Sequence, residues 1–116
     1  MTGYALLDDL PEALHVELAD RGRGRLLTVR GGLDLATAPT LERALASQTR
    51  RPGPLVLDLR GLSFIDATGL AVLLGAATDA RRHRCTLELV PGDAVTRLLE
   101  LCGVRACFSY TDAPAS

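Results

Sequence analysis

Apolar residues recur along the chain first with the spacing of a strand and later with the spacing of a helix. Every second residue of the stretch 14–18 is apolar, which predicts a strand with one buried face. The Arg-Gly cluster at 21–25 predicts a turn, and the apolar residues at 26–29 predict the returning strand of a hairpin. The stretch 31–34, which begins with two glycines, predicts a loop.

Two helices are predicted next, with a buried strand between them. The stretch 37–39 places Pro in the first turn of a helix that is expected to run to about Thr49. The apolar run at 55–59 predicts a strand covered on both faces, and 61–65 predicts a loop. A second helix is expected to begin near Asp66. The apolar residues after it are spaced three and four apart, as on one helix face: Leu70, Leu73, Leu74 and Ala77.

The rest of the chain predicts one more strand and helix. Cys85–Val90 predicts a strand, the following helix is expected to end at Gly103, and a short strand at 107–110 precedes a polar tail at 111–116. The order β-β-α-β-α-β-α-β predicts an α/β fold. Strands joined through a helix favour parallel pairing, whereas the opening hairpin is antiparallel. We therefore expect a mixed sheet of four to five strands with at least three helices packed on it.

Length and charge narrow the classes of function. The 116 residues fit one domain, taken as 1–116 with its core at about 14–110. All 13 basic residues are Arg, and with 14 acidic residues the formal net charge is -1. A balanced charge gives no electrostatic signature of nucleic-acid binding, so we expect no nucleic-acid partner. The absence of Lys excludes Schiff-base chemistry and the phosphate-binding Lys of a P-loop.

Cysteine usage and the first residues favour a cytoplasmic protein. Cys85, Cys102 and Cys107 form no C-x-x-C pair, so they are interpreted as small apolar core residues rather than as disulfide or zinc-site residues. The stretch 1–10 contains two Asp and lacks the pattern of a signal peptide. The longest apolar stretch is far shorter than the ~20 residues of a membrane span. We expect no direct membrane insertion.

Few side chains could carry catalysis. The carboxylates of Asp58 and Asp66 could serve as acid or base, but neither His15 nor His83 completes a nucleophile-base set with them. The arginines of the 21–25 cluster are interpreted as a solvated turn rather than an anion site. We expect no catalytic residue, no metal and no cofactor, and hence a protein that is not an enzyme.

The start of the second helix is the most informative segment. Asp66 is a suitable N-cap, because its carboxylate can accept hydrogen bonds from backbone N–H groups one turn on. Gly69 inside a helix costs about 0.5–1 kcal/mol relative to Ala, so its position needs a reason. Either the helix packs closely on the sheet there, or a partner approaches the helix start. A phosphate at this end would lie at the positive pole of the helix dipole.

Several motifs together resemble the STAS domain of bacterial anti-sigma factor antagonists. They are LDLATAP at 33–39, LDL at 57–59 and FIDATGL at 64–70, and LLELCGV at 98–104 resembles the end of that family's third helix. The resemblance spans about 14–108 and implies a single STAS-like domain. It also implies that the chain binds an anti-sigma factor kinase and so frees a sigma factor for transcription. In this family the kinase phosphorylates the antagonist and releases it, and a phosphatase reverses the modification.

Two positions depart from the family pattern. Members generally carry Ser directly after the Asp of the FIDATGL motif, whereas Ala67 has no hydroxyl to accept phosphate. Gly32 stands where many relatives have Glu, which changes only the local loop charge. Three hypotheses remain open. Thr68 accepts the phosphate instead, or nothing is phosphorylated and the protein binds constitutively, or Asp66 and Thr68 only cap the helix. The loss of the usual acceptor favours the second.

The resemblance implies a partner-binding surface. The loop before the first helix and the start of the second follow strands at the same edge of the sheet, so we expect them to lie together. The expected partner-binding residues are Asp34, Leu35, Thr37, Ser63, Asp66, Ala67, Thr68, Gly69, Leu70 and Ala71. The expected function is an anti-sigma factor antagonist whose phosphorylation control is altered or lost. The alternative is a STAS adaptor subunit of a larger assembly, such as a lipid-transport complex or a stress-sensing scaffold.

Overall fold

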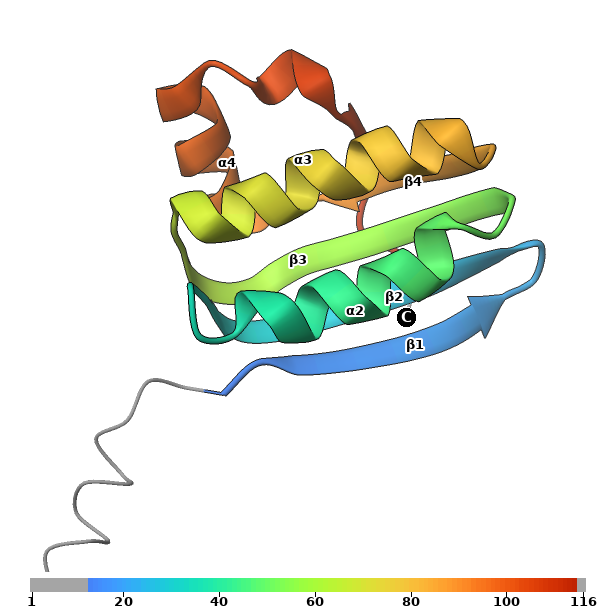
Figure 1. The fold of residues 1–116 in the computed structure, drawn as a ribbon, viewed down its shortest axis with the longest axis horizontal. Coiled ribbons are helices and arrows are strands. Elements are labelled where there is room, and N and C mark those ends of the chain that lie inside the picture. The colour runs from blue at the N-terminus through green and yellow to red at the C-terminus, as the bar shows by residue number, and fades with distance from the viewer. Residues whose placement is uncertain (1–12, 115–116) are drawn as a thin grey trace, which may run out of the picture.

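The computed structural model describes residues 13–114 and shows an α/β fold in which helices pack on a mixed five-stranded sheet (Figure 1). The elements in chain order are β1 (His15–Arg21), β2 (Gly24–Leu33), α2 (Ala38–Thr49), β3 (Gly53–Ile65), α3 (Ala67–Arg82), β4 (Cys85–Val90), α4 (Gly92–Cys102), the 3-10 helix η1 (Arg105–Cys107) and β5 (Ser109–Tyr110). The predicted hairpin, mixed sheet and three helices are confirmed. The predictions for 1–10 and for the last two residues of the polar tail lie outside the described residues.

The strands lie in the order β1-β2-β3-β4-β5. β1 pairs with β2 antiparallel, and the remaining neighbours pair in parallel. α2 and α3 lie side by side along the same face of the sheet (Figure 1). α4 packs against β3, in the part of that strand that extends past its pairing with β4. Gly92 at the start of α4 lies close to this strand, because a Cβ on Gly92 would lie only 2.7 Å from the Cα of Arg60.

Two stretches that were predicted to be loops are strand. Gly31 pairs with Leu62 and Leu33 pairs with Ile65, so β2 and β3 continue side by side to their last residues. The register shifts near Gly31, which has φ +111, and a Cβ there would collide with the backbone of Ala13. Glycine therefore marks an irregularity and a close backbone approach within the strand, and the loop predictions for 31–33 and 61–65 were wrong.

The core between the sheet and the two helices is almost entirely aliphatic. Leu70, Leu73 and Ala77 of α3 are buried as predicted, while Leu74 is only half-buried. The fully buried large side chains come mostly from α2, β2 and β3, and they include Leu27, Val29, Leu33, Leu41, Leu45, Leu55, Leu57 and Leu59. Leu55, Leu57 and Leu59 of β3 are all fully buried, which explains the apolar run predicted at 55–59.

The interpretation of the cysteines as core residues holds for Cys85 and fails for the other two. Cys85 is buried on β4 among the aliphatic side chains. Cys102 is the last residue of α4 and Cys107 lies in η1, and both are exposed. Neither residue belongs to the buried core, so the lack of a C-x-x-C pair was not sufficient to place them there.

Arg25 is buried, which contradicts its assignment to a solvated turn. Its Nη1 donates to the backbone oxygen and to Oε1 of Gln48, each at 2.8 Å, and its Nη2 donates to the carbonyl oxygens of Arg51 (3.1 Å) and Pro52 (3.3 Å). These acceptors lie at the C-terminal end of α2, where the helix dipole also favours a positive charge. Arg25 therefore ties the end of α2 to the start of β2.

Candidate functional site

The two connections that were expected to share an edge of the sheet do so. Leu33 ends β2 and pairs with Ile65 at the end of β3. The backbone N–H of Asp66 then donates to the carbonyl oxygen of Leu33 at 3.1 Å. The loop that leads into α2 and the start of α3 therefore lie next to each other, at the left-hand end of Figure 1.

Asp66 is the N-cap of α3, as predicted. Its backbone is extended, with φ -114 and ψ -173, and its Oδ1 accepts a hydrogen bond from the N–H of Gly69 at 3.0 Å. Its carbonyl oxygen accepts the first helical hydrogen bond, from the N–H of Leu70 at 3.0 Å. The half-buried carboxylate thus stabilises the helix start and still reaches the surface.

Gly69 is buried against the ends of the two strands. A Cβ at this position would lie 2.7 Å from Cγ of Leu33 and 2.9 Å from Cγ1 of Ile65. Close packing of α3 on the sheet therefore explains why residue 69 is a glycine. Gly69 and Leu70 are both buried, so they support the predicted surface from beneath.

The loop before α2 is held by its own polar side chains. Oδ1 of Asp34 accepts from the N–H groups of Ala36 and Thr37, both at 3.0 Å. The Thr37 hydroxyl donates to the carbonyl oxygen of Gly32 at 2.7 Å and accepts from the N–H of Asp34 at 3.0 Å. Asp34 and Thr37 therefore shape the loop, and Leu35, 75% exposed, projects from it.

The remaining predicted residues form a shallow surface around the start of α3. Ser63, Ala67 and Ala71 are exposed and Thr68 is half-buried. The Ser63 hydroxyl donates to the carbonyl oxygen of Gly31 at 3.3 Å, which links β3 to β2 beside the site. The exposed residues in the first two turns of α3, Ala67 and Ala71, thus have small side chains.

Phe64 belongs to this region, although the predicted set of binding residues omitted it. Its side chain is 50% exposed at the end of β3, directly before Ile65. Its partner in the register is Gly32, which has no side chain to cover it. An aromatic residue paired with a glycine is a signal that only the strand register makes visible.

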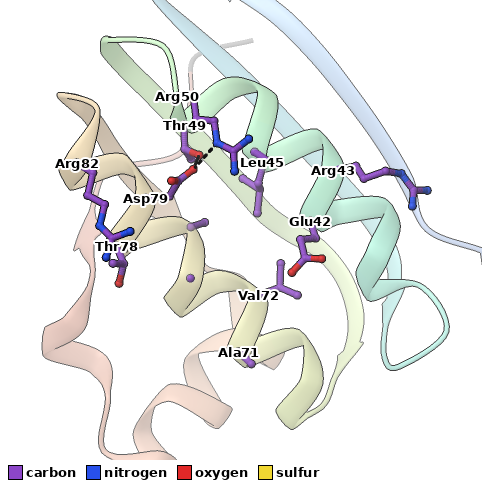
Figure 2. A pocket seen from close by; sticks show the side chains of 13 residues that line it. Glu42, Arg43, Leu45, Thr49, Arg50, Ala71, Val72, Thr78, Asp79 and Arg82 are labelled. Carbon is purple, nitrogen blue, oxygen red and sulfur yellow. Dashed lines mark hydrogen bonds and ion pairs between the residues drawn. The ribbon is translucent and has the colours of Figure 1, made fainter.

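A groove of about 590 Å³ runs between α2 and α3 away from this surface (Figure 2). Ala71 and Val72 line the end near the helix start, with Glu42 across from them on α2. At the far end the Thr49 hydroxyl donates to Oδ2 of Asp79 at 2.8 Å, and Nε of Arg50 lies 3.4 Å from the same oxygen. The Thr49 hydroxyl and the nearby Arg50 hold the pKa of Asp79 below its usual range.

Asp58, one of the two carboxylates considered for acid–base chemistry, is occupied by an ion pair. Nε and Nη2 of Arg60 donate to its two oxygens at 3.0 and 2.8 Å. The Arg60 hydrogen bonds hold the pKa of Asp58 below its usual range, so Asp58 stays ionised near neutral pH and is a poor proton donor.

Within residues 13–114, no group of three or more His, Cys, Asp or Glu side chains is placed to hold a metal ion. None of the helices described between residues 13 and 114 has the length and hydropathy that a membrane-spanning helix needs.

Comparison with known proteins agrees with this fold. The family model described as STAS domain matches residues 15–113, so the chain belongs to the STAS domain family. It is 34% identical over 95 residues to the anti-sigma-F factor antagonist RsfA of Mycobacterium tuberculosis, a match that covers 78% of this chain and 74% of RsfA. It is 35% identical over 99 residues to the anti-sigma-F factor antagonist RsfB of the same organism, covering 84% and 81%. The crystal structure of an anti-sigma factor antagonist from Mycobacterium paratuberculosis has the same fold, with a TM-score of 0.74, 23% identity and 87% of each chain covered.

The packing around Gly69 gives a test with a matched control in the same helix. Gly69→Ala places a methyl group against Leu33 and Ile65, and such overpacking costs about 1–3 kcal/mol, more than the ~1 kcal/mol gained in helix propensity. Nothing lies within 4 Å of a Cβ at exposed Gly75, so Gly75→Ala is expected to raise the free energy of unfolding by about 0.5–1 kcal/mol. Urea unfolding of both variants measures the difference. Equal stabilisation by the two substitutions would contradict the close packing of α3 on the strand ends.

Proposed function

We propose that this chain is an anti-sigma factor antagonist that binds an anti-sigma factor of the serine/threonine kinase type and so frees a sigma factor for transcription. The observation that carries the proposal is the joint surface of the 34–37 loop and the first turns of α3, in a chain whose STAS relatives are named as antagonists. We propose further that the chain acts in the cytoplasm by binding alone, and that any covalent chemistry comes from its partner.

The composition of the surface supports protein binding. Leu35 and Phe64 offer exposed apolar side chains, and Ala67 and Ala71 are small enough for a partner to approach the α3 backbone closely. Asp66 adds a carboxylate at the centre of this apolar area. An apolar centre with few polar groups is the usual anatomy of a recognition surface.

The helix start also supports altered phosphorylation control. Ala67 is the first residue of α3 and is exposed, so it occupies an accessible position but has no hydroxyl. Thr68 is rotated about 100° from it around the helix axis and is half-buried. A kinase that reaches position 67 meets a methyl group there, which favours an antagonist that phosphorylation does not release.

The binding surface is tested by reversing the charge at its centre. Asp66→Arg is expected to abolish binding to the kinase-type anti-sigma factor in calorimetry, because it removes the central carboxylate and adds a long cation. Loss of the N-cap is expected to cost about 0.5–2 kcal/mol of stability, and Asp66→Asn keeps a good N-cap while removing the charge. Asp93→Arg changes the same residue type in the first turn of α4 and is expected to leave binding unchanged.

Wild-type affinity in Asp66→Arg, or an equal loss in Asp93→Arg, would place the binding surface elsewhere. Thermal unfolding of each variant separates a lost contact from a lost fold. A chain that captured only a transporter or scaffold subunit, and no anti-sigma factor, would favour the adaptor alternative instead.

Phosphorylation control is tested by incubating the protein with its kinase-type anti-sigma factor and ATP and measuring the intact mass. The wild type is expected to gain no phosphate, because Ala67 offers no acceptor. Ala67→Ser is expected to gain one phosphate and to bind the kinase more weakly afterwards. A phosphate on the wild type that Thr68→Ala abolishes would show that Thr68 is the acceptor and that control is displaced rather than lost.

A further inference from the structure

The end of the molecule opposite the candidate site gathers three connections. The β1–β2 turn, the α2–β3 loop and the α3–β4 loop all lie at the right-hand end of Figure 1. The exposed arginines on these connections and the residues that flank them are here called the arginine end. They are Arg21, Arg23, Arg51, Arg81, Arg82 and Arg84; Arg50 in the α2–β3 loop is also exposed but is left out of the set, because its Nε lies 3.4 Å from Oδ2 of Asp79.

The positive charge of the arginine end is largely uncompensated. The side-chain ion pairs among residues 13–114 include none of its six members. Asp20 and Asp79 are the acidic residues on the described strand and helix ends that meet there, and Asp79 is already 3.4 Å from Nε of Arg50. Arg25 faces inward and is held by carbonyl oxygens, so it does not contribute to this surface.

The formal net charge of -1 hides this local excess. The 16 residues of α3 span about 24 Å, and the Debye length at physiological ionic strength is about 8 Å. Acidic residues at the other end, such as Asp34, Asp66 and Asp93, are therefore screened from the arginine end. A partner that approaches from that side meets a cationic surface.

The backbone conformation of Arg84 independently supports a functional role for its side chain. It has φ 57, the left-handed conformation, directly after the C-cap residue His83 of α3. Gly103 ends α4 in the same conformation with φ 68, and glycine adopts it without strain. An Arg in this position costs stability that a glycine would recover, and such strain is typical of functional positions.

We propose that the arginine end binds the surface of a membrane that contains anionic phospholipid, without insertion. Guanidinium groups bind phosphate oxygens in a bidentate manner, and basic clusters are attracted to anionic bilayers. Three separate connections at one end suit a broad flat surface. The exposed large apolar side chains of the described residues, Leu18, Leu35, Phe64 and Leu101, lie outside these three connections, so contact stays at the headgroups.

The same features argue against nucleic acid as the occupant. No Phe, Tyr or Trp lies on the three connections to stack with single-stranded bases, and Nδ1 of the half-buried His83 lies 2.8 Å from the carbonyl oxygen of Asp79. The β1–β2 hairpin is part of the five-stranded sheet, because β2 also pairs with β3 from Arg25 onward, so it offers no free two-stranded ribbon to enter the major groove of a duplex. Membrane contact through the arginine end would leave the start of α3 facing away from the bilayer and open to a protein partner.

Sedimentation of the full chain with vesicles tests the proposal. Binding is expected with vesicles of phosphatidylcholine and phosphatidylserine at low salt, and not with phosphatidylcholine alone or at high salt. Arg84→Gly is expected to weaken binding about fivefold, the effect of one basic residue near the surface, while raising the thermal midpoint by relieving strain. Arg97→Gln on α4 is the matched control and is expected to change nothing.

Three results would overturn the proposal. They are no salt-sensitive binding to the phosphatidylserine vesicles, an equal loss of binding in Arg97→Gln and Arg84→Gly, or tighter binding to duplex DNA than to the vesicles. Asp66→Arg is expected to bind vesicles like the wild type. The membrane proposal and the proposed antagonist function therefore fail separately.

Discussion

The hydrogen bond from the Asp66 N–H to the carbonyl oxygen of Leu33 joins the ends of β2 and β3, and the candidate site depends on that junction. Because the two strands stay paired to their last residues, the chain leaves the sheet twice at the same place. One exit forms the 34–37 loop and the other starts α3. Gly69 lets the helix approach the strand ends closely enough for both exits to form one surface.

The polar side chains of this surface are mostly committed to structure. Asp34 and Thr37 bond the backbone of their own loop, and the carboxylate of Asp66 caps α3. What is left for a partner is Oδ2 of Asp66, which does not take part in the capping hydrogen bond, and a set of exposed apolar or small side chains. On such a surface a hydroxyl at position 67 would be an accessible place to add a charge, so the methyl group of Ala67 carries functional weight in the proposed mechanism.

The features that local sequence determines were predictable, and those that depend on distant residues were not. Asp66 was recognisable as an N-cap because capping involves residues three positions apart. Gly31 suggested a loop because nothing local shows that Ala13 lies against it. Arg25 resembled its neighbours in the turn, yet its acceptors on α2 and the following loop are 23 to 27 residues away.

The charge pattern shows the same limit. The residue count gives a nearly neutral chain, because it does not show where the charged side chains lie. The fold separates many of these charges. Connections that lead into the parallel strands carry many of the arginines, whereas the segments that follow those strands carry aspartates. The arginine end and the candidate binding surface, separated by more than a Debye length, can serve two different contacts at once.

In the proposed function, the 34–37 loop and the start of α3 form one surface that a single partner covers. Chemical-shift perturbation of the isotope-labelled protein by a kinase-type anti-sigma factor tests it most directly. Amides of 34–37 and of 63–71 are expected to shift together at the same partner concentration, while those of β1 and α4 are expected to keep their shifts. Shifts confined to one of the two segments, or centred on α4, would contradict it.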